Sequence, residues 1–103
     1  MIKIEILKNN YVKQVIIKGH ANYQDYGKDI VCSAVSSIVI TSVNGIIAIN
    51  EKTINYEEAK DKITINIALN DEITNKLMLN MINLLKELQI QYPKNIYIKE
   101  ENL

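Results

Sequence analysis

The sequence predicts an α+β fold: a two-layer sandwich in which two helices pack on one mixed or antiparallel sheet, in the order ββαββαβ. Two observations predict it. Short segments alternate apolar and polar residues with the period of a strand, and two longer segments have the length or the periodicity of helices. With 103 residues and no linker, repeat or low-complexity tract, the chain is expected to form a single domain over residues 1–103.

The first predicted element pair is a β-hairpin. Residues 2–8 alternate and residues 11–18 return as the second strand. Asn9–Asn10 supply the turn, because asparagine tolerates left-handed backbone angles, and Gly19 ends the second strand. One face of the first strand is expected to be buried: Ile2, Ile4 and Ile6.

An uncharged stretch over residues 30–49 predicts a long helix with Asp29 as its N-cap. Its β-branched residues favour a strand locally, but roughly 20 residues without a turn signal is the length of a helix. The stretch is also long enough to span a bilayer. Its serines, threonine and asparagine argue against a membrane span, so we expect a helix buried on most sides of a small domain. One stripe is expected to face the core: Val31, Val35, Ile38, Ser42 and Ile46.

The second half predicts two strands, a helix and a last strand. Residues 53–57 and 62–69 read as strands, Asp71 as the N-cap of a helix that Pro93 stops, and residues 95–99 as the last strand. The inward residues of the second of these strands are expected to be Ile63, Ile65, Ile67 and Leu69. On the helix, the expected apolar positions are Ile73, Leu77, Met81, Leu84, Leu85 and Leu88, and the expected water-facing positions are Glu72, Lys76, Asn80, Asn83 and Glu87.

Composition argues against some classes of partner. Twelve basic residues balance twelve acidic ones and all the bases are lysines, so direct nucleic-acid binding is not expected. A single cysteine cannot form an internal disulfide, and charged residues stand among the first five, unlike a signal peptide. We therefore expect a reducing, cytoplasmic location.

The sole histidine and the sole cysteine, His20 and Cys32, stand twelve positions apart, on either side of a loop expected from His20 to Lys28. With Asp29 as N-cap, Cys32 would lie in the first helical turn, where unpaired N–H groups and the helix dipole stabilise a thiolate. An imidazole could accept the thiol proton and later protonate a leaving amine. Two alternatives stay open: a buried structural cysteine with an unrelated histidine, and a zinc site that adds Asp25 and Asp29 but lacks the paired spacing of such sites.

The segment "GHA" with a following loop that ends in "YGKDIVCSAVS" resembles the signature of the ribosomal-processing cysteine proteases. The resemblance covers nearly the whole chain, because the hairpin before, the helix ending in "SVNGI" and the amphipathic helix after it also fit. It implies that Cys32 is the nucleophile and His20 the general base and acid, without metal or cofactor. It further implies a homodimer that removes the N-terminal extension of the precursor of the large-subunit ribosomal protein numbered twenty-seven, through a thioester.

The resemblance also extends to Asp29 and Ser36, which match positions that the family holds near its site. Asp29 would cap the helix or orient His20, and Ser36 would contact the site or bond back to a helical carbonyl. The loop would be flexible and contact substrate through Gly19, Tyr23, Tyr26 and Gly27. A second function stays open: a non-catalytic, ribosome-associated binding module of the same fold.

Overall fold

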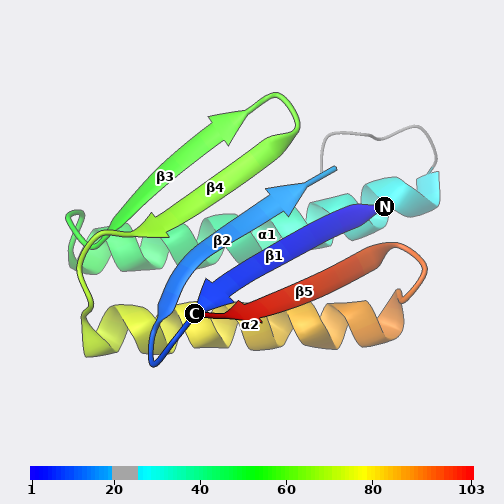
Figure 1. Cartoon of the computed structure of the whole chain (residues 1–103). Helices are drawn as coiled ribbons and strands as arrows, with labels where there is room; N and C mark the ends of the chain where they lie inside the picture. Colours follow the sequence, from blue (N-terminus) through cyan, green and yellow to red (C-terminus); the bar gives the residue numbers. More distant parts are fainter. Residues whose placement is uncertain (20–25) are drawn as a thin grey trace.

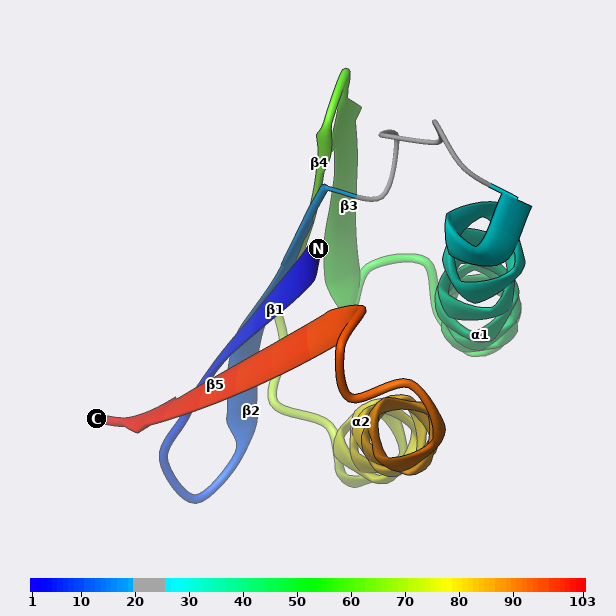
Figure 2. The ribbon, with the colours of Figure 1, turned by 90° about the vertical axis from the view of Figure 1, so that its right-hand side faces the viewer.

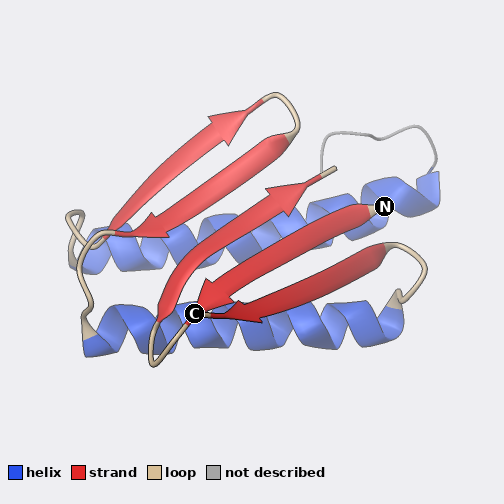
Figure 3. Ribbon diagram, in the orientation of Figure 1, coloured by secondary structure: helices blue, strands red, loops and turns tan. Residues whose placement is uncertain are grey.

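The computed structural model describes residues 1–19 and 26–103, with the backbone alone described for residues 26–29. The chain forms one layer of strands and one layer of helices (Figure 1, Figure 3). The elements are β1 Ile2–Lys8, β2 Val12–Lys18, α1 Tyr26–Ile49, β3 Ile54–Ala59, β4 Lys62–Ile67, α2 Glu72–Gln91 and β5 Ile96–Asn102. This is the order predicted from the sequence, and the α+β prediction is confirmed.

The sheet is mixed. Its five strands follow the order β3-β4-β2-β1-β5, with β1 and β5 parallel and all other neighbours antiparallel. Figure 2 shows α1 and α2 against the same face of this sheet. Because β4 and β5 run in the same direction but are separated by two strands, α2 is the crossover that connects them. The opposite face of the sheet carries no helix among the described residues.

The turn between β1 and β2 lies at Asn9–Asn10, as predicted, but for a different reason. No described residue other than glycine has a positive φ, so tolerance of left-handed angles is not used here. Instead, the side-chain oxygen of Asn9 accepts a hydrogen bond from the N–H of Tyr11 at 3.0 Å, and the N–H of Asn9 donates to the carbonyl of Tyr11 at 3.0 Å. A side chain that bonds the backbone two residues later is the Asx turn that asparagine favours.

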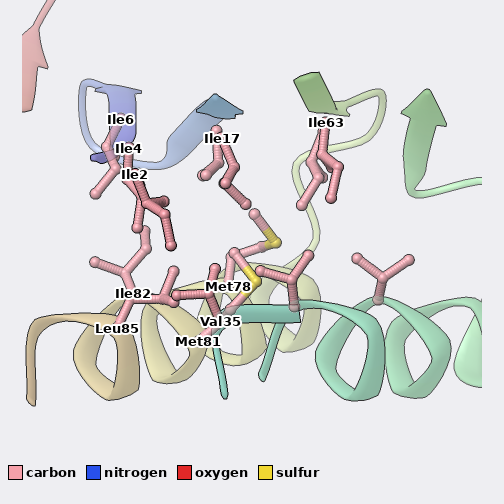
Figure 4. Packing of buried hydrophobic residues seen from close by; sticks show 14 of the residues in the cluster. Ile2, Ile4, Ile6, Ile17, Val35, Ile63, Met78, Met81, Ile82 and Leu85 are labelled. Atoms are coloured by element: carbon pink, nitrogen blue, oxygen red, sulfur yellow. The ribbon is translucent and has the colours of Figure 1, made fainter. Parts of the chain in front are cut away.

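The core lies between the sheet and the two helices. The side chains of Ile2, Ile4 and Ile6 are buried and point from β1 toward Ile82 and Leu85 of α2 (Figure 4). Complete burial of an isoleucine or leucine side chain contributes about 1.5–3 kcal/mol. The buried cluster that holds both helices on the sheet is made mainly of aliphatic and methionine side chains, in keeping with the absence of Phe and Trp.

The predicted inner faces of the later elements were partly wrong. Leu69, Ile73 and Leu84 were expected to face the core, but they are 50%, 53% and 39% exposed. Leu69 lies beyond β4, which ends at Ile67, so the strand alternation no longer applies to it. Ile73 and Leu84 flank the stripe that α2 buries, which consists of Thr74, Met78, Met81, Ile82 and Leu85. The N-cap of α2 is Asp71, as predicted: its carboxylate accepts from the N–H of Ile73 at 3.0 Å.

Helix α1 differs from the prediction in its start and in its burial. It begins at Tyr26, three residues before the expected N-cap Asp29. It buries one stripe rather than most of its surface. Ile38 and Ser42, expected in that stripe, are half-buried, and the buried residues are Val31, Val35, Val39, Val43 and Ile46. Residues 30–49 have a mean hydropathy of 2.0, and a third of an 18-residue window (33%) is buried. In the described part of the chain, α1 is the one helix long and apolar enough to cross a membrane. In this structure its buried stripe packs against the sheet and belongs to the core.

Candidate active site

The end of β2 fixes where the chain leaves the sheet, directly before His20. Gly19 has a φ of +82°, and a Cβ at this position would lie 2.6 Å from the carbonyl oxygen of Met1. Its N–H donates to the carbonyl oxygen of Asp61 at 3.2 Å. Only glycine combines this backbone angle with such a close approach. The strand end is thereby held between the start of β1 and the β3–β4 turn.

The start of α1 lies at the same end of the molecule as this strand end (Figure 1). Cys32 is in the second turn of α1 and is 3% exposed, within the core cluster that includes Val31 and Val35. The end of β2, directly before His20, and the helical turn that carries Cys32 thus lie at one end of the two-layer structure. The burial of Cys32 is also what the alternative of a structural cysteine predicts.

The prediction that α1 begins after Asp29 was wrong, and the earlier start moves Cys32 from the first helical turn to the second. In a helix that begins at Tyr26, the N–H groups without intrahelical partners are those of the first turn, residues 26–28 among them. The N–H of Cys32 is not among them, so the predicted place of Cys32 in the first turn is wrong. The dipole effect also falls off beyond the first turn. A thiolate at Cys32 would therefore gain little from the helix start.

Several predicted site residues fall outside what the structure describes. His20 and Tyr23 are not among the described residues, and for Tyr26, Gly27 and Asp29 the description is limited to the backbone. Their backbone positions nevertheless correct two expectations. Tyr26 and Gly27 belong to the first turn of α1 rather than to a loop, and Asp29 follows the helix start, so it is not the N-cap. The His20–Cys32 dyad itself stays a prediction.

Ser36 lies one turn after Cys32 on α1 and is half-buried. Its hydroxyl forms no hydrogen bond to any residue that the structure describes. Ser42 shows what the back-bonded alternative looks like, since its hydroxyl donates to the carbonyl of Ile38 at 2.7 Å. The alternative in which Ser36 bonds back to a helical carbonyl is therefore not supported.

Two grooves whose lining residues the structure describes flank α1, and neither was predicted from the sequence. The first, between α1 and α2, has a volume of about 450 Å³ and is lined by Ser37, Ile38, Thr41, Ser42, Gly45, Leu77, Asn80 and Leu84. The second, between α1 and β3, has a volume of about 260 Å³ and is lined by Ile40, Val43, Asn44, Ile47, Tyr56 and Glu58. The available signal was the uncharged stretch 30–49, which leaves the solvent side of α1 as free of charge as its buried side.

Tyr56 in the second groove is half-buried and packs against the core. Burial raises the pKa of its hydroxyl, and the neighbouring Glu58 carboxylate raises it further by charge and by a hydrogen bond between the two side chains. Tyr56 and Glu58 are two positions apart on β3, so they share one face of the strand. Together they place a neutral phenol and a carboxylate on the sheet side of the groove.

The described residues contain no group of three His, Cys, Asp or Glu side chains that could hold a metal ion. The zinc alternative rests on His20, Asp25 and Asp29, which are not covered by that search. It is neither supported nor tested by the described residues.

This chain is similar to known proteins over nearly its full length. It matches the family model described as "Cysteine protease Prp" over residues 1–97. A ribosomal processing cysteine protease Prp from Mycoplasma genitalium is 35% identical over 104 residues, which covers 99% of this chain and 98% of the relative. The protein of the same name from Staphylococcus aureus is 32% identical over 101 residues, with 93% and 95% covered.

The solved structures give the same result for the fold. An essential ribosomal processing protease Prp from S. aureus, in complex with a substrate peptide, matches with a TM-score of 0.91 and 26% identity, covering 98% of this chain and 100% of that one. The complex of S. aureus Prp with a covalently linked product peptide matches with a TM-score of 0.88 and 27% identity, at the same coverage. The predicted resemblance to ribosomal-processing cysteine proteases is confirmed.

Proposed function

This chain belongs to the Prp family of cysteine proteases, and we propose that it removes the N-terminal extension of the large-subunit ribosomal protein numbered twenty-seven. One observation carries the choice of nucleophile: Cys32 is the sole cysteine of the chain. A cysteine protease attacks with a thiolate, so the nucleophile of this chain is Cys32. His20 is the sole histidine, and hence the sole side chain whose ordinary pKa suits proton transfer near neutral pH.

The proposed reaction has two halves. The imidazole of His20 takes the thiol proton, and the Sγ atom of Cys32 attacks the carbonyl carbon of the scissile peptide bond. His20 then gives that proton to the leaving nitrogen, the C–N bond breaks, and the extension stays on Cys32 as a thioester. Water next attacks the thioester and gives its proton to His20; the C–S bond breaks, a carboxylate leaves and the thiol is restored. A covalently linked product peptide in the S. aureus relative is consistent with such an intermediate.

Two further residues are proposed to support the dyad. Asp29 would orient His20, since capping is excluded by the start of α1 at Tyr26. Asp29→Asn should then lower kcat and change the pH dependence of kcat/KM, while the free energy of unfolding stays the same. Ser36 would contact the site or the substrate with its hydroxyl. Ser36→Ala should lower kcat/KM, and unchanged turnover would remove Ser36 from the site.

The test uses the full-length ribosomal precursor from the same organism, mixed with the chain and followed by intact-mass spectrometry. Cys32→Ala and His20→Ala variants run in parallel, each checked for folding by circular dichroism. We expect one cut at the end of the extension with the wild type and none with either variant. An uncut precursor, with all proteins folded, would refute the processing role and favour a non-catalytic, ribosome-associated binding module. A cut that survives Cys32→Ala would refute the nucleophile.

We also propose that the chain works in the cytoplasm, because the thiol must stay reduced and ribosomal proteins are made there. Cell fractionation with an antibody against the chain would test this. Recovery in the membrane pellet after a high-salt wash would contradict it and would give the apolar segment 30–49 a different meaning.

A homodimer is a further proposal, supported by the groove between α1 and α2. The α1 side of this groove carries no charged residue. In a two-fold contact the same patch of both subunits meets, so a patch without charge brings no like charges together. Analytical ultracentrifugation should give a dimer for the wild type. Thr41→Arg should shift it to monomer, whereas Asn83→Arg, an exposed position outside the groove, should not. A monomeric wild type at micromolar concentration would contradict the proposal.

A further inference from the structure

The open edge of the sheet at β3 provides an unused row of hydrogen-bonding groups. β3 pairs with β4 on one side and, within residues 1–19 and 26–103, has no neighbouring strand on the other. Every second residue of an edge strand directs its N–H and C=O groups outward, where another extended chain can pair with them. Peptides that add to such edges gain affinity from the backbone and specificity from alternate side-chain pockets.

The groove of about 260 Å³ lies between this strand and α1. Its apolar lining comes mainly from α1, where Ile40 and Ile47 are 46% and 39% exposed. Its polar lining comes from Asn44 and from the Tyr56–Glu58 pair. A row of backbone groups beside an apolar groove is the combination that an extended peptide with alternating side chains requires.

The groove leads toward the proposed active site. β3 begins near the end of α1 and runs toward the β3–β4 turn, whose Asp61 accepts the hydrogen bond from Gly19, directly before His20. Along α1, Ile40 follows Cys32 by two turns, which corresponds to about 12 Å. An extended peptide covers that distance with about four residues. Residues about four to seven positions from the cut would therefore reach the groove.

The charge of the groove favours a basic or neutral peptide. Among the residues that line the groove, Glu58 is the charged one, and it is exposed. Glu57 alternates with it along β3 and faces the other side of the sheet. The facing side of α1 carries no charged residue between positions 30 and 49. Opposite charge on a partner would be attracted here, and an acidic segment would be repelled.

We propose that the groove between β3 and α1 binds an extended segment of the protein substrate, which adds to the sheet as a strand beside β3. This inference rests on the proposed function, because it assigns the groove to the substrate of Cys32. It accounts for an open strand edge, an exposed apolar wall and an acidic rim that the chemistry of bond cleavage does not use.

The first test measures cleavage of two peptides, one with eight residues and one with three residues on each side of the cut. Ile47→Asp should lower kcat/KM for the long peptide about tenfold or more, as expected for a lost isoleucine contact, and leave the short peptide unchanged. Ile90→Asp on α2, at a side chain 78% exposed and outside the groove, is the matched control and should change neither. Equal losses for both peptides, or no loss, would overturn the proposal.

The second test does not need cleavage, so it separates this inference from the proposed function. The long peptide, labelled for fluorescence anisotropy, is titrated with the Cys32→Ala chain with and without Ile47→Asp. Equal affinities would overturn the groove as the binding site even if the wild type cuts the precursor. Weaker binding with Ile47→Asp would support it even if cleavage fails.

A series of long peptides, each methylated at one backbone nitrogen, tests strand addition itself. Methylation removes a donor, so binding should weaken at every second position within the segment that reaches the groove. A flat profile would overturn pairing with β3. Ultracentrifugation of Ile47→Asp gives a further check: loss of a wild-type dimer would show that a second copy, and not substrate, covers this groove.

Discussion

Replacement of Gly19 by alanine is expected to destabilise the fold by about 1–5 kcal/mol, although it adds a single methyl group. Two costs contribute. A residue with a Cβ at a φ of +82° costs about 1–2 kcal/mol. The new Cβ would also lie 2.6 Å from the carbonyl oxygen of Met1, a backbone atom that cannot rotate away, and such crowding costs about 1–3 kcal/mol. A less flexible unfolded chain offsets roughly 0.4–1 kcal/mol of this sum.

The assay is urea unfolding followed by far-UV circular dichroism, with the loss read from the midpoint at constant slope. A domain with about 5–15 kcal/mol of stability would remain folded, so the variant can be compared directly. A loss below about 0.5 kcal/mol, the usual size of an unspecific surface effect, would refute the close contact between Gly19 and Met1. Because His20 follows Gly19, cleavage activity measured on the folded variant should fall as well.

The other glycine, capping and charge predictions have opposite or smaller effects. Gly45→Ala should stabilise the chain by about 0.5–1 kcal/mol, because it is helical and a Cβ there meets no atom within 4 Å; a lower melting temperature would contradict this. Asp71→Ala should lose about 1 kcal/mol in urea unfolding and Asp71→Asn little, because asparagine also caps; equal losses would contradict capping. A hydrogen bond from Lys86 lowers the pKa of the Glu100 carboxyl, and a second one from Lys8 lowers it further. Both outweigh the partial burial of Glu100, which raises it. Its stabilisation is therefore complete above the ordinary carboxyl pKa and is lost as the pH falls through the lowered one, so Glu100→Gln should flatten the acid side of the stability–pH curve.

Local periodicity was sufficient to predict which segments form strands and their order along the chain. The alternation in β1 identified the buried face because a strand with one face on a helical layer needs apolar residues at every second position. The cap at Asp71 was equally visible, since its carboxylate serves only the backbone two residues later. Such features depend on neighbours in the sequence, and they are therefore readable from it.

The errors occurred where a tertiary contact decides the outcome. The stripe buried by α2 includes Thr74 and Met78 and leaves Ile73 and Leu84 exposed, because the orientation of the helix on the sheet selects the face. The start of α1 was misplaced because Asp29 is a good N-cap in isolation, while the helix begins at Tyr26. Propensity is a weak guide when packing chooses among several adequate starts.

The candidate site was predictable in identity but not in surroundings. The unique His20 and Cys32 and the motif around them are visible in the sequence. The two grooves beside α1 are not, because they depend on how far α2 and β3 stand from that helix. The uncharged stretch 30–49 does not show which neighbours stand beside the exposed side of the helix.

The parallel pairing of β1 with β5 has a consequence for folding during synthesis on the ribosome. Ile2 lies opposite Ile96, so almost the whole chain separates the two partners. Such distant contacts form late and slow the folding of small domains. During synthesis β1 leaves the ribosome early and pairs with β2, but its other edge stays open until β5 has also emerged. A nascent chain with an open strand edge is prone to pair with strands of other chains and aggregate. Point mutations in β5 should therefore reduce the soluble yield in cells more than mutations in α2 that lower the free energy of unfolding by the same amount.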